Sequence, residues 1–351
     1  MISILTAYLG RAYREFRDEV LVLPSKVLLV LFCLALFLLP AITSQPYVLR
    51  IVILACIFGI FAASWDLLSG FTGQLNFGHA LFFGVAGYTS ALLNMHVNLP
   101  PGLTIPLGAL AAVVAGLIVG VPCLRLRGPY LALATLAFPL ILTGIIYIFP
   151  ALTGGERGVS GLDPLSGSRL IDYYIAAVLL LGLGFIMWKI TSSKTGIIFH
   201  AIREDEVAVR ASGINTTRYK LLAFCLSGLF AGIAGGLYVH FLRAASPIST
   251  LHILVSFQVI IWAIFGGIAT IYGPIVGVFI LVPLTEVLSI FPVVSDLRML
   301  LFALVILLVL MFMPEGISTW VRDKVEKECP RCKIRNIATR KQCRVCGAEL
   351  G

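Results

Sequence analysis

Long apolar stretches recur along the whole chain, and they constrain its fold more than any other feature of the sequence. Each is about 18 to 23 residues long, which as an α-helix is enough to cross a hydrocarbon core of ~30 Å. The stretches are continuously apolar rather than alternating, which excludes a membrane β-barrel. Only 12% of the residues are charged, against roughly 25% in a soluble domain. The sequence therefore predicts an all-α, polytopic helical membrane protein.

We predict about ten membrane spans, some of them interrupted, in a transmembrane domain over residues 27–314. An arm over residues 1–26 precedes them, and its pattern fits equally a helix on the membrane surface and a cytoplasmic extension of the first span. No processing site follows the first apolar run, so we expect a retained anchor. A polar tail, 315–351, follows. The predicted spans begin near Val27, Val48, His79, Leu103, Tyr130, Tyr173, Lys220, Leu251, Gly273 and Arg298.

The positions of Lys and Arg predict the orientation. With ten spans both termini share a side, and all but five of the 26 basic residues lie there. The positive-inside rule makes that side the cytoplasm, so we expect a multi-pass cell-membrane protein with both termini cytoplasmic. The net charge of +9 follows from this asymmetry and indicates no nucleic-acid partner. The five exceptions are Arg50, Arg157, Arg169, Arg243 and Arg298.

The segment 194–219 is predicted to lie outside the bilayer. Eight charges fall between Lys194 and Lys220, and inserting them at about 3 kcal/mol each would cost about 24 kcal/mol. Between residues 197 and 212 the apolar positions lie along one side of an amphipathic helix. Gly213 fits the left-handed residue that ends it, and Asn215 or Thr216 can cap the next helix. So short a helix needs a partner that covers its apolar face.

Gly and polar residues interrupt three apolar segments, at 70–84, 125–139 and 265–277. Such backbone persists in lipid only when protein buries it or when it lines a watered cavity, and it points to a transport path. Close packing of helices at glycine is the alternative. Asp66 and Glu286 are acidic residues at membrane depth, where a pathway role and a helix-end role both fit. The residues predicted to line the path are Gln74, Asn76, His79 and Thr135, with Thr153, Gly154 and Gly155 near its outer mouth.

Four cysteines in the tail form two CxxC pairs that are ten residues apart: Cys329 with Cys332, and Cys343 with Cys346. Two such pairs supply four thiolates to one tetrahedral zinc, so we predict a zinc ribbon over residues 329–347. Four cysteines leave no open coordination position, so this Zn²⁺ would be structural. Disulfides are disfavoured on the reducing, cytoplasmic side. No GxxxxGK[ST] loop and no hydrolytic constellation occur, so we expect neither a bound nucleotide nor an enzyme.

Several stretches carry a family resemblance: SWDLLSGFTGQLNFGHALFFGVAGYTSALL, LRLRGPYLALATLAF, LTGGERGVSGL, REDEVAVRASGINTTRYKLLAFCLSGLFAGIAGGLYVH and AIFGGIATIYGPIVG. On these the sequence resembles the permease subunits of the branched-chain amino acid ABC importers. The resemblance implies that this chain forms half of a transport pathway for branched-chain or other hydrophobic amino acids. It also implies a homologous permease subunit, two ABC ATPase subunits and an extracytoplasmic solute-binding protein. The four-Cys tail lies outside the usual family pattern.

The resemblance further implies that Glu206, Ala208 and Gly213 belong to the coupling motif that docks on the ATPase. Here the Glu precedes the Gly by seven residues rather than the usual six. We expect an apolar stripe to enter a cleft on the ATPase, with three charged residues at its polar rim. The stripe is Ile198, Ile202 and Val209, and the rim is Arg203, Glu206 and Arg210.

Three alternatives remain open at this level. A permease of the same family for urea or short amides would share all the motifs above. An ion-coupled secondary transporter or channel would not need a docking helix and would favour paired ionisable residues at mid-membrane. A membrane-anchored zinc adaptor would bind another protein or a nucleic acid through its basic tail, although a solvated basic face is the simpler interpretation of those charges.

Overall fold

The computed structural model describes residues 24–43, 45–124, 126, 128–290 and 315–332, with shorter pieces at 303–304, 307, 311–313, 335–340, 342–343 and 345–349. The predictions for the arm before residue 24 and for the span near Arg298 fall outside the described residues. The chain divides into two compact units. The larger unit is Ser44–Ile317, and the smaller combines Met1–Thr43 with Ser318–Gly351.

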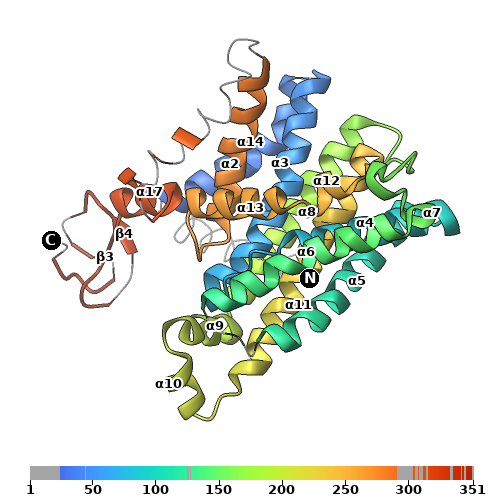
Figure 1. The fold of residues 1–351 in the computed structure, drawn as a ribbon. Helices are drawn as coiled ribbons and strands as arrows, with labels where there is room; N and C mark the ends of the chain where they lie inside the picture. The colour runs from blue at the N-terminus through green and yellow to red at the C-terminus, as the bar shows by residue number, and fades with distance from the viewer. Residues whose placement is uncertain are drawn as a thin grey trace, which may run out of the picture. The chain divides into compact units, whose positions relative to one another are not determined.

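Helices make up most of the larger unit (Figure 1). They are α3 (Pro46–Trp65), the π-helical turn η1 (Asp66–Gly70), α4 (Ala80–Val97), α5 (Pro101–Cys123), α6 (Pro129–Ile148), α7 (Pro150–Thr153), the 3₁₀ turn η2 (Gly155–Arg157), α8 (Arg169–Thr191), α9 (Lys194–Glu204), α10 (Glu206–Ala211), α11 (Thr216–Leu242), α12 (Pro247–Thr250), α13 (Ile253–Gly266) and α14 (Tyr272–Ile290). Two short strands, β1 (Val159–Ser160) and β2 (Ala244–Ala245), pair antiparallel. The smaller unit contains α2 (Pro24–Ile42), all but the first residue of α17 (Ile317–Val325), and the antiparallel strands β3 (Glu326–Glu328) and β4 (Arg335–Ile337).

The prediction of a polytopic helical membrane protein is confirmed. Among the described residues, seven helical stretches are long and apolar enough to cross a membrane. They are Pro46–Gly70, Ala80–Val97, Pro101–Cys123, Pro129–Ile148, Arg169–Thr191, Thr216–Leu242 and Pro247–Gly266. Two shorter apolar helices, Val27–Ile42 and Tyr272–Leu288, correspond to the first and ninth predicted spans. Every predicted span start within the described residues therefore falls on or beside an apolar helix.

The core of the larger unit forms around α3 and α11. In an apolar 18-residue stretch of the span that begins with α3, 89% of the residues are buried, because α8, α11, α13 and α14 all pack against α3. A helix that is apolar on all sides is expected in such a position. On α11, glycines bring neighbouring backbones close: a Cβ on Gly235 would lie 2.1 Å from the carbonyl oxygen of Phe83 on α4. In the corresponding 18-residue stretch of the α6 span only 28% of the residues are buried.

Two of the three predicted interruptions are present. Helix α3 passes through η1 into irregular backbone before α4 begins at Ala80, and residues 267–271 separate α13 from α14. The third is wrong, because α6 runs without a break from Pro129 to Ile148. The residues that suggested it connect α5 to α6, and Pro129 takes the first helical position, where a proline lacks no needed hydrogen bond.

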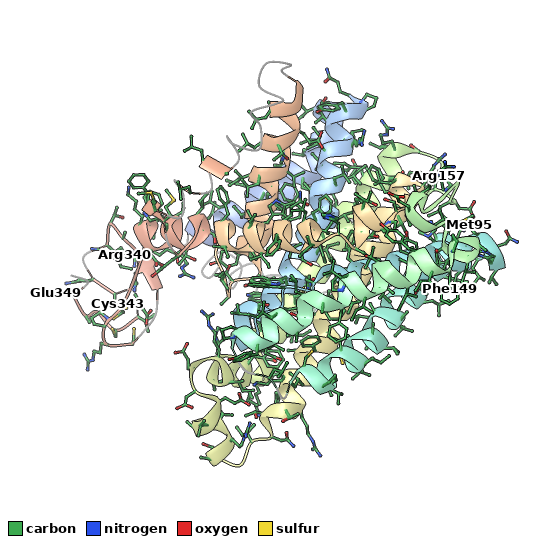
Figure 2. All side chains as sticks on the ribbon, viewed as in Figure 1. Met95, Phe149, Arg157, Arg340, Cys343 and Glu349 are labelled. Carbon is green, nitrogen blue, oxygen red and sulfur yellow. The ribbon has the colours of Figure 1, made fainter. Side chains whose placement is uncertain are left out.

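The larger unit has two distinct ends. Helix α11 has 27 residues, about 40 Å at 1.5 Å per residue, beginning beside α10 and ending beside β2. Figure 1 shows α9 and α7 at opposite ends of α4. At the α7 end β1 pairs with β2, and Gly158 is required there because a Cβ would lie 2.0 Å from the carbonyl oxygen of Ala245. Met95, Phe149 and Arg157 all lie at this end (Figure 2).

Candidate functional site

The irregular segment between η1 and α4 buries three of the predicted path residues. Gln74, Asn76 and His79 are each no more than 3% exposed. Gly73 has φ +70°, a left-handed conformation that glycine adopts without strain and that turns the chain away from the helix. The chain thus leaves one membrane span and enters the next through polar backbone that lies inside the protein.

Polar side chains satisfy this backbone. The amide oxygen of Asn76 accepts from the Gly78 N–H at 2.9 Å, and the carbonyl of Asn76 accepts from the Trp65 indole N–H at 2.8 Å. His79 Nε2 lies 2.9 Å from the Ser64 hydroxyl oxygen. Thr135 on α6 joins the group, because its hydroxyl oxygen accepts from the Phe77 N–H at 3.1 Å. The structure therefore brings four of the predicted path residues to one segment and gives at least two of them a structural task.

Gln74 lies next to the start of α11. Its amide nitrogen donates to the Thr72 hydroxyl oxygen at 2.9 Å and to the backbone carbonyl of Lys220 at 3.4 Å. Its amide oxygen is buried and has no hydrogen-bond partner among the described residues. A buried acceptor without a donor is unfavourable in a static protein, so this side chain is the least satisfied polar group of the segment.

Thr153, Gly154 and Gly155 lie at the opposite end of the unit, on and after α7. The Thr153 hydroxyl donates to the carbonyls of Ile146 and Phe149 and accepts from the Gly155 N–H at 3.3 Å. Gly154 and Gly155 both have positive φ, which suits the tight reversal from α7 to η2. These three residues shape a turn and do not join the segment that contains Gln74.

Asp66, at the start of η1, binds the backbone of the second interruption, residues 267–271 between α13 and α14. Its carboxylate accepts from the backbone N–H groups of Ala269 at 2.6 Å, Thr270 at 3.0 Å and Ile271 at 3.0 Å. Ala269 and Ile271 have φ of 60° and 59°, which is unfavourable for residues with a Cβ. Both breaks in the membrane helices are therefore fastened to each other by one buried carboxylate.

A buried polar cluster near the α7 end was not predicted from the sequence. His240 Nε2 lies 2.9 Å from the Ser90 hydroxyl oxygen and 3.0 Å from that of Thr104, and Nδ1 lies 2.8 Å from the carbonyl oxygen of Asp163. Asn94 donates to the Asp163 carboxylate at 2.8 Å and accepts from its backbone N–H. A histidine within an apolar span was the signal that could have revealed this cluster.

The charged segment 194–219 forms two helices rather than the single one predicted. Asp205 has extended backbone, with φ −151°, and separates α9 from α10. Its carboxylate accepts from the N–H groups of Val207 at 2.8 Å and Ala208 at 3.0 Å, so it caps α10. An aspartate side chain can accept hydrogen bonds from nearby backbone N–H groups and so replace the helical pattern of hydrogen bonds. The amphipathic spacing of the apolar residues does not reveal such a break.

The apolar stripe predicted to enter another subunit is buried within this chain. Ile202 is 4% exposed and Val209 is 8% exposed, while Ile198 is half-buried. That part of the prediction has to be corrected, because α9 packs on α8 and α11, and α10 packs on α9 and α11, all within the same chain. Ile197 and Val207 are the large apolar residues of the two helices that stay exposed, at 68% and 65%.

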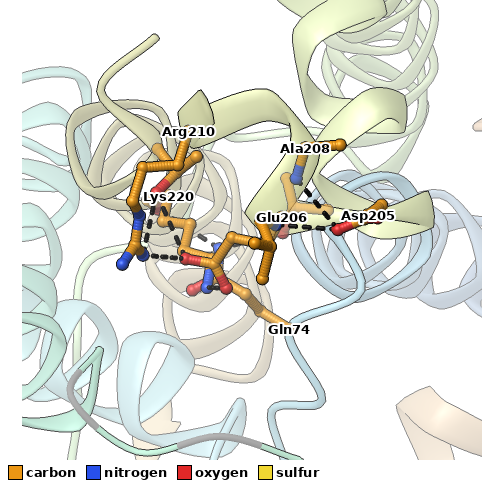
Figure 3. Close-up of polar contacts among 9 residues, drawn as sticks. Gln74, Asp205, Glu206, Ala208, Arg210 and Lys220 are labelled. Carbon is orange, nitrogen blue, oxygen red and sulfur yellow. Dashed lines mark hydrogen bonds and ion pairs between the residues drawn. The ribbon is translucent and has the colours of Figure 1, made fainter. Parts of the chain in front are cut away.

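Glu206 is an internal partner of α11 rather than a rim residue. Its carboxylate accepts from Lys220 at 2.5 Å, from Arg210 at 2.8 Å and from the Thr216 hydroxyl at 3.1 Å (Figure 3). Partial burial alone would raise the pKa of Glu206, but the Lys220 and Thr216 hydrogen bonds and the Lys220 and Arg210 charges lower it below its ordinary value. The side chains of Lys220 and Glu206 are only 12% and 21% exposed. This pair therefore joins the start of α10 firmly to α11.

Arg203, in the last turn of α9, reaches the interrupted segment. Its guanidinium donates to the carbonyl of Gly70 at 2.6 Å, and its stem lies beside Gly73. The neighbouring His200 stacks edge-on against Phe71, with ring centroids 4.9 Å apart. Burial, and then the Arg203 charge, lower the pKa of His200, which favours the neutral imidazole against that ring.

The end of the segment has the predicted backbone geometry. Gly213 has φ +83°, and the Ile214 N–H donates to the carbonyl of Val209 across the end of α10. This is the bonding of a glycine-terminated helix. Asn215 then caps α11, accepting from the Arg218 N–H at 3.2 Å. Both predictions about local geometry are confirmed.

The four tail cysteines form a cluster that could hold a metal ion. All four Sγ atoms lie within 4.8 Å of one another. Backbone N–H groups of Cys346 and Val345 at the sulfur lower the pKa of Cys343 to about 6, and the N–H of Cys332 lowers that of Cys329. Gly347 has φ +67° and its N–H donates to the carbonyl of Cys343. Such amide-lined thiols on tight turns suit a tetrahedral thiolate site.

These features define a polytopic helical membrane protein with two broken spans fastened to each other and to a charged segment outside the spans. The chain belongs to the family described as "Branched-chain amino acid transport system / permease component", which matches residues 47–310. It is therefore a transport permease and not an enzyme, and the family resemblance inferred from the sequence is confirmed.

Several curated relatives are similar over much of their length. The LivM permease protein of the high-affinity branched-chain amino acid transport system of Escherichia coli K12 is 30% identical over 343 residues, 88% of this chain and 78% of that protein. The LivM protein of Salmonella typhimurium is 28% identical over 94% of this chain and 85% of its own. The ribose import permease RbsC of E. coli K12 is 28% identical over 58% of this chain and 68% of that protein. No solved structure gives a significant match.

Proposed function

We propose that this chain forms half of the transport path of an ABC importer for branched-chain or other hydrophobic amino acids. A homologous permease supplies the other half, two ATPase subunits bind on the cytoplasmic side, and an extracytoplasmic binding protein delivers the solute. Membership of the permease family over residues 47–310 carries this proposal. The helices α9 and α10, outside the spans and between two of them, support an ATPase partner.

The choice of solute rests on the extent of similarity. The two LivM relatives match 94% and 88% of this chain, whereas the ribose permease matches 58%. The same pattern of broken spans would also serve urea or a short amide, which remains the alternative solute. The scarcity of charged residues in the described spans does not favour an ion-coupled transporter.

Reconstituted transport tests the proposal. The chain would be produced with the second permease, the ATPases and the binding protein of its own organism and placed in proteoliposomes that contain ATP. We expect uptake of labelled leucine that requires both ATP and the binding protein. Uptake of urea but not of leucine would show that the proposed solute is wrong. Uptake driven by an ion gradient without ATP would contradict the proposal of an ABC importer.

We further propose that the exposed side of α9 and α10 docks on the ATPase. Ile197 and Val207 are its proposed apolar anchors, and Ala208, Arg210 and Gly213, which follow Val207 in the chain, are also exposed. The internal side, with Ile202 and Val209, holds the two helices on the permease. The change Val207→Asp is expected to reduce ATPase co-purification at least fivefold, whereas Arg218→Glu, an exposed charge reversal on α11, should not. Equal retention of the ATPase by both variants would contradict the docking surface.

The interrupted segment is the proposed side of the transport path. Gln74, Asn76, His79 and Thr135 supply polar groups between apolar spans, and the turn at 153–155 lies at the other end of the unit, where we propose the outer mouth. The excess of Lys and Arg supports cytoplasmic termini. The unsatisfied amide oxygen of Gln74 supports a role beyond packing.

For the tail we propose one structural Zn²⁺ per chain. Four thiols with all sulfurs within 4.8 Å match the donor set and number of a structural zinc site. Cys329, Cys332, Cys343 and Cys346 would take all four positions, which leaves none for solute. We therefore propose that residues 315–351 form a separate cytoplasmic module that the transport step does not use.

A further inference from the structure

We propose that Arg203 and Glu206 are positioning residues that carry the motion of α9 and α10 to the interrupted segment at residues 70–74. Arg203 acts directly, and Glu206 acts through Lys220. The inference rests on the proposed docking of α9 and α10 on an ATPase, and it concerns the side of these helices that faces away from that docking surface.

The first link runs from α9 to the end of η1. Arg203 donates to the carbonyl of Gly70 at 2.6 Å, one of the carbonyls at a helix end that require a partner from elsewhere. Gly70 packs directly against Asp66, because a Cβ there would lie 1.9 Å from Asp66 Oδ1. Since Asp66 also holds residues 269–271, a pull on Gly70 reaches both breaks in the membrane helices.

The second link runs from α10 through α11. Glu206 binds the ammonium of Lys220, and the backbone carbonyl of the same lysine accepts from the Gln74 amide at 3.4 Å. Figure 3 shows Gln74 beneath this group. Gln74 is fixed in turn by the Ser69 hydroxyl, which donates to its carbonyl at 2.9 Å. The two links therefore end on the same short stretch of the chain.

The two links start on either side of the break between the cytoplasmic helices. Arg203 lies in the last turn of α9 and Glu206 is the first residue of α10, with the extended Asp205 between their helices. Rotation of α9 against α10 at Asp205 would move the two attachments in different directions. The partly buried state of the Glu206 and Lys220 side chains, 21% and 12% exposed, makes that attachment stronger than an ordinary surface ion pair.

Breaking a contact that transmits motion and breaking one that is only structural should affect ATP hydrolysis, uptake and assembly differently. Breaking a structural contact lowers the amount of assembled complex, and hydrolysis and uptake fall together. Breaking a transmitting contact leaves the ATPase bound and hydrolysing while uptake falls. The number of ATP molecules hydrolysed per solute imported separates the two cases.

The test compares Arg203→Met and Glu206→Gln with the conservative changes Arg203→Lys and Lys220→Arg in the reconstituted importer, with Arg218→Met on the exposed side of α11 as the matched control. We expect the first two to retain the ATPase and raise ATP hydrolysed per solute roughly tenfold, within the range of typical coupling energies. The conservative variants and the control should stay within about twofold of the wild type. Because Glu206 and Lys220 form one link, adding Lys220→Met to Glu206→Gln should raise the ratio no further.

Four results would overturn the inference. An unchanged ratio, or a parallel fall of hydrolysis, uptake and assembled complex that Arg203→Lys does not rescue, would leave the two residues only structural. Loss of the ATPase from Glu206→Gln would assign the residue to the docking surface instead, with the importer function intact. If the wild-type chain binds no ATPase, the proposed function fails as well, which the wild-type control reports before any variant is compared.

Discussion

Replacing Asp66 by Asn should destabilise the membrane domain more than any other single isosteric change among the described polar side chains. In the wild type two carboxylate oxygens accept three buried N–H groups, at 2.6, 3.0 and 3.0 Å. The amide of Asn keeps one acceptor and presents a donor to the remaining N–H groups. One or two hydrogen bonds to a charged acceptor are lost, at roughly 1.5 to 3 kcal/mol each, so we expect about 2 to 6 kcal/mol.

The two left-handed residues make the turn at 269–271 depend on this carboxylate. Ala269 and Ile271 remain at positive φ because the carboxylate binds their N–H groups, and each conformation is unfavourable by roughly 1 to 2 kcal/mol. Without that carboxylate the turn can relax, which separates α13 from the end of η1. We therefore expect loss of uptake together with the loss of stability.

Thermal unfolding of the purified chain in detergent measures the effect, and Asp172→Asn is the matched control. Asp172 accepts one hydrogen bond, from Ser166 at 2.7 Å, near the start of α8. At roughly 2 to 4 °C per kcal/mol for a mid-sized domain, Asp66→Asn should lower the midpoint by at least 4 °C. A midpoint within about 1 °C of the Asp172→Asn value would refute the reasoning that this carboxylate fastens the two breaks.

Three further predictions follow from the site. Gly213→Val opposes φ +83° at roughly 1 to 2 kcal/mol and should lower ATP-coupled uptake with little change in chain insertion, whereas wild-type uptake would contradict a geometric role for this glycine. Metal analysis of the purified full chain should find one zinc, and less than a fifth of that in a variant with Cys332→Ser and Cys343→Ser; equal zinc in both would exclude the cluster, and loss of uptake in the well-assembled variant would contradict a tail that transport does not use. After replacement of the native cysteines, Thr135→Cys should react with a small thiol reagent in one nucleotide state and be protected in another, and protection in every state would argue against a path beside α6.

Local sequence patterns predicted the spans and the short motifs. A long run of apolar residues by itself predicts a membrane span, and a glycine or asparagine by itself favours a particular backbone conformation. The helices, the left-handed Gly213 and the cap at Asn215 could therefore be predicted without knowledge of the rest of the chain. The two CxxC pairs likewise predict metal binding from the spacing of a few residues. Nothing in such patterns says which other segment covers an apolar face.

Contacts between distant segments decided the rest. The stripe on α9 and α10 was recognisable as apolar, but only the packing of α9 on α8 and α11, and of α10 on α9 and α11, shows that Ile202 and Val209 are already buried. The partners of Asp66 lie more than 200 residues away in the sequence, and those of His240 up to 150. Burial and hydrogen bonding are properties of the folded arrangement rather than of any window of sequence. The sequence by itself thus determined a polytopic helical permease, while the tertiary structure decided which of its polar residues fasten the broken spans and which remain free to meet a partner.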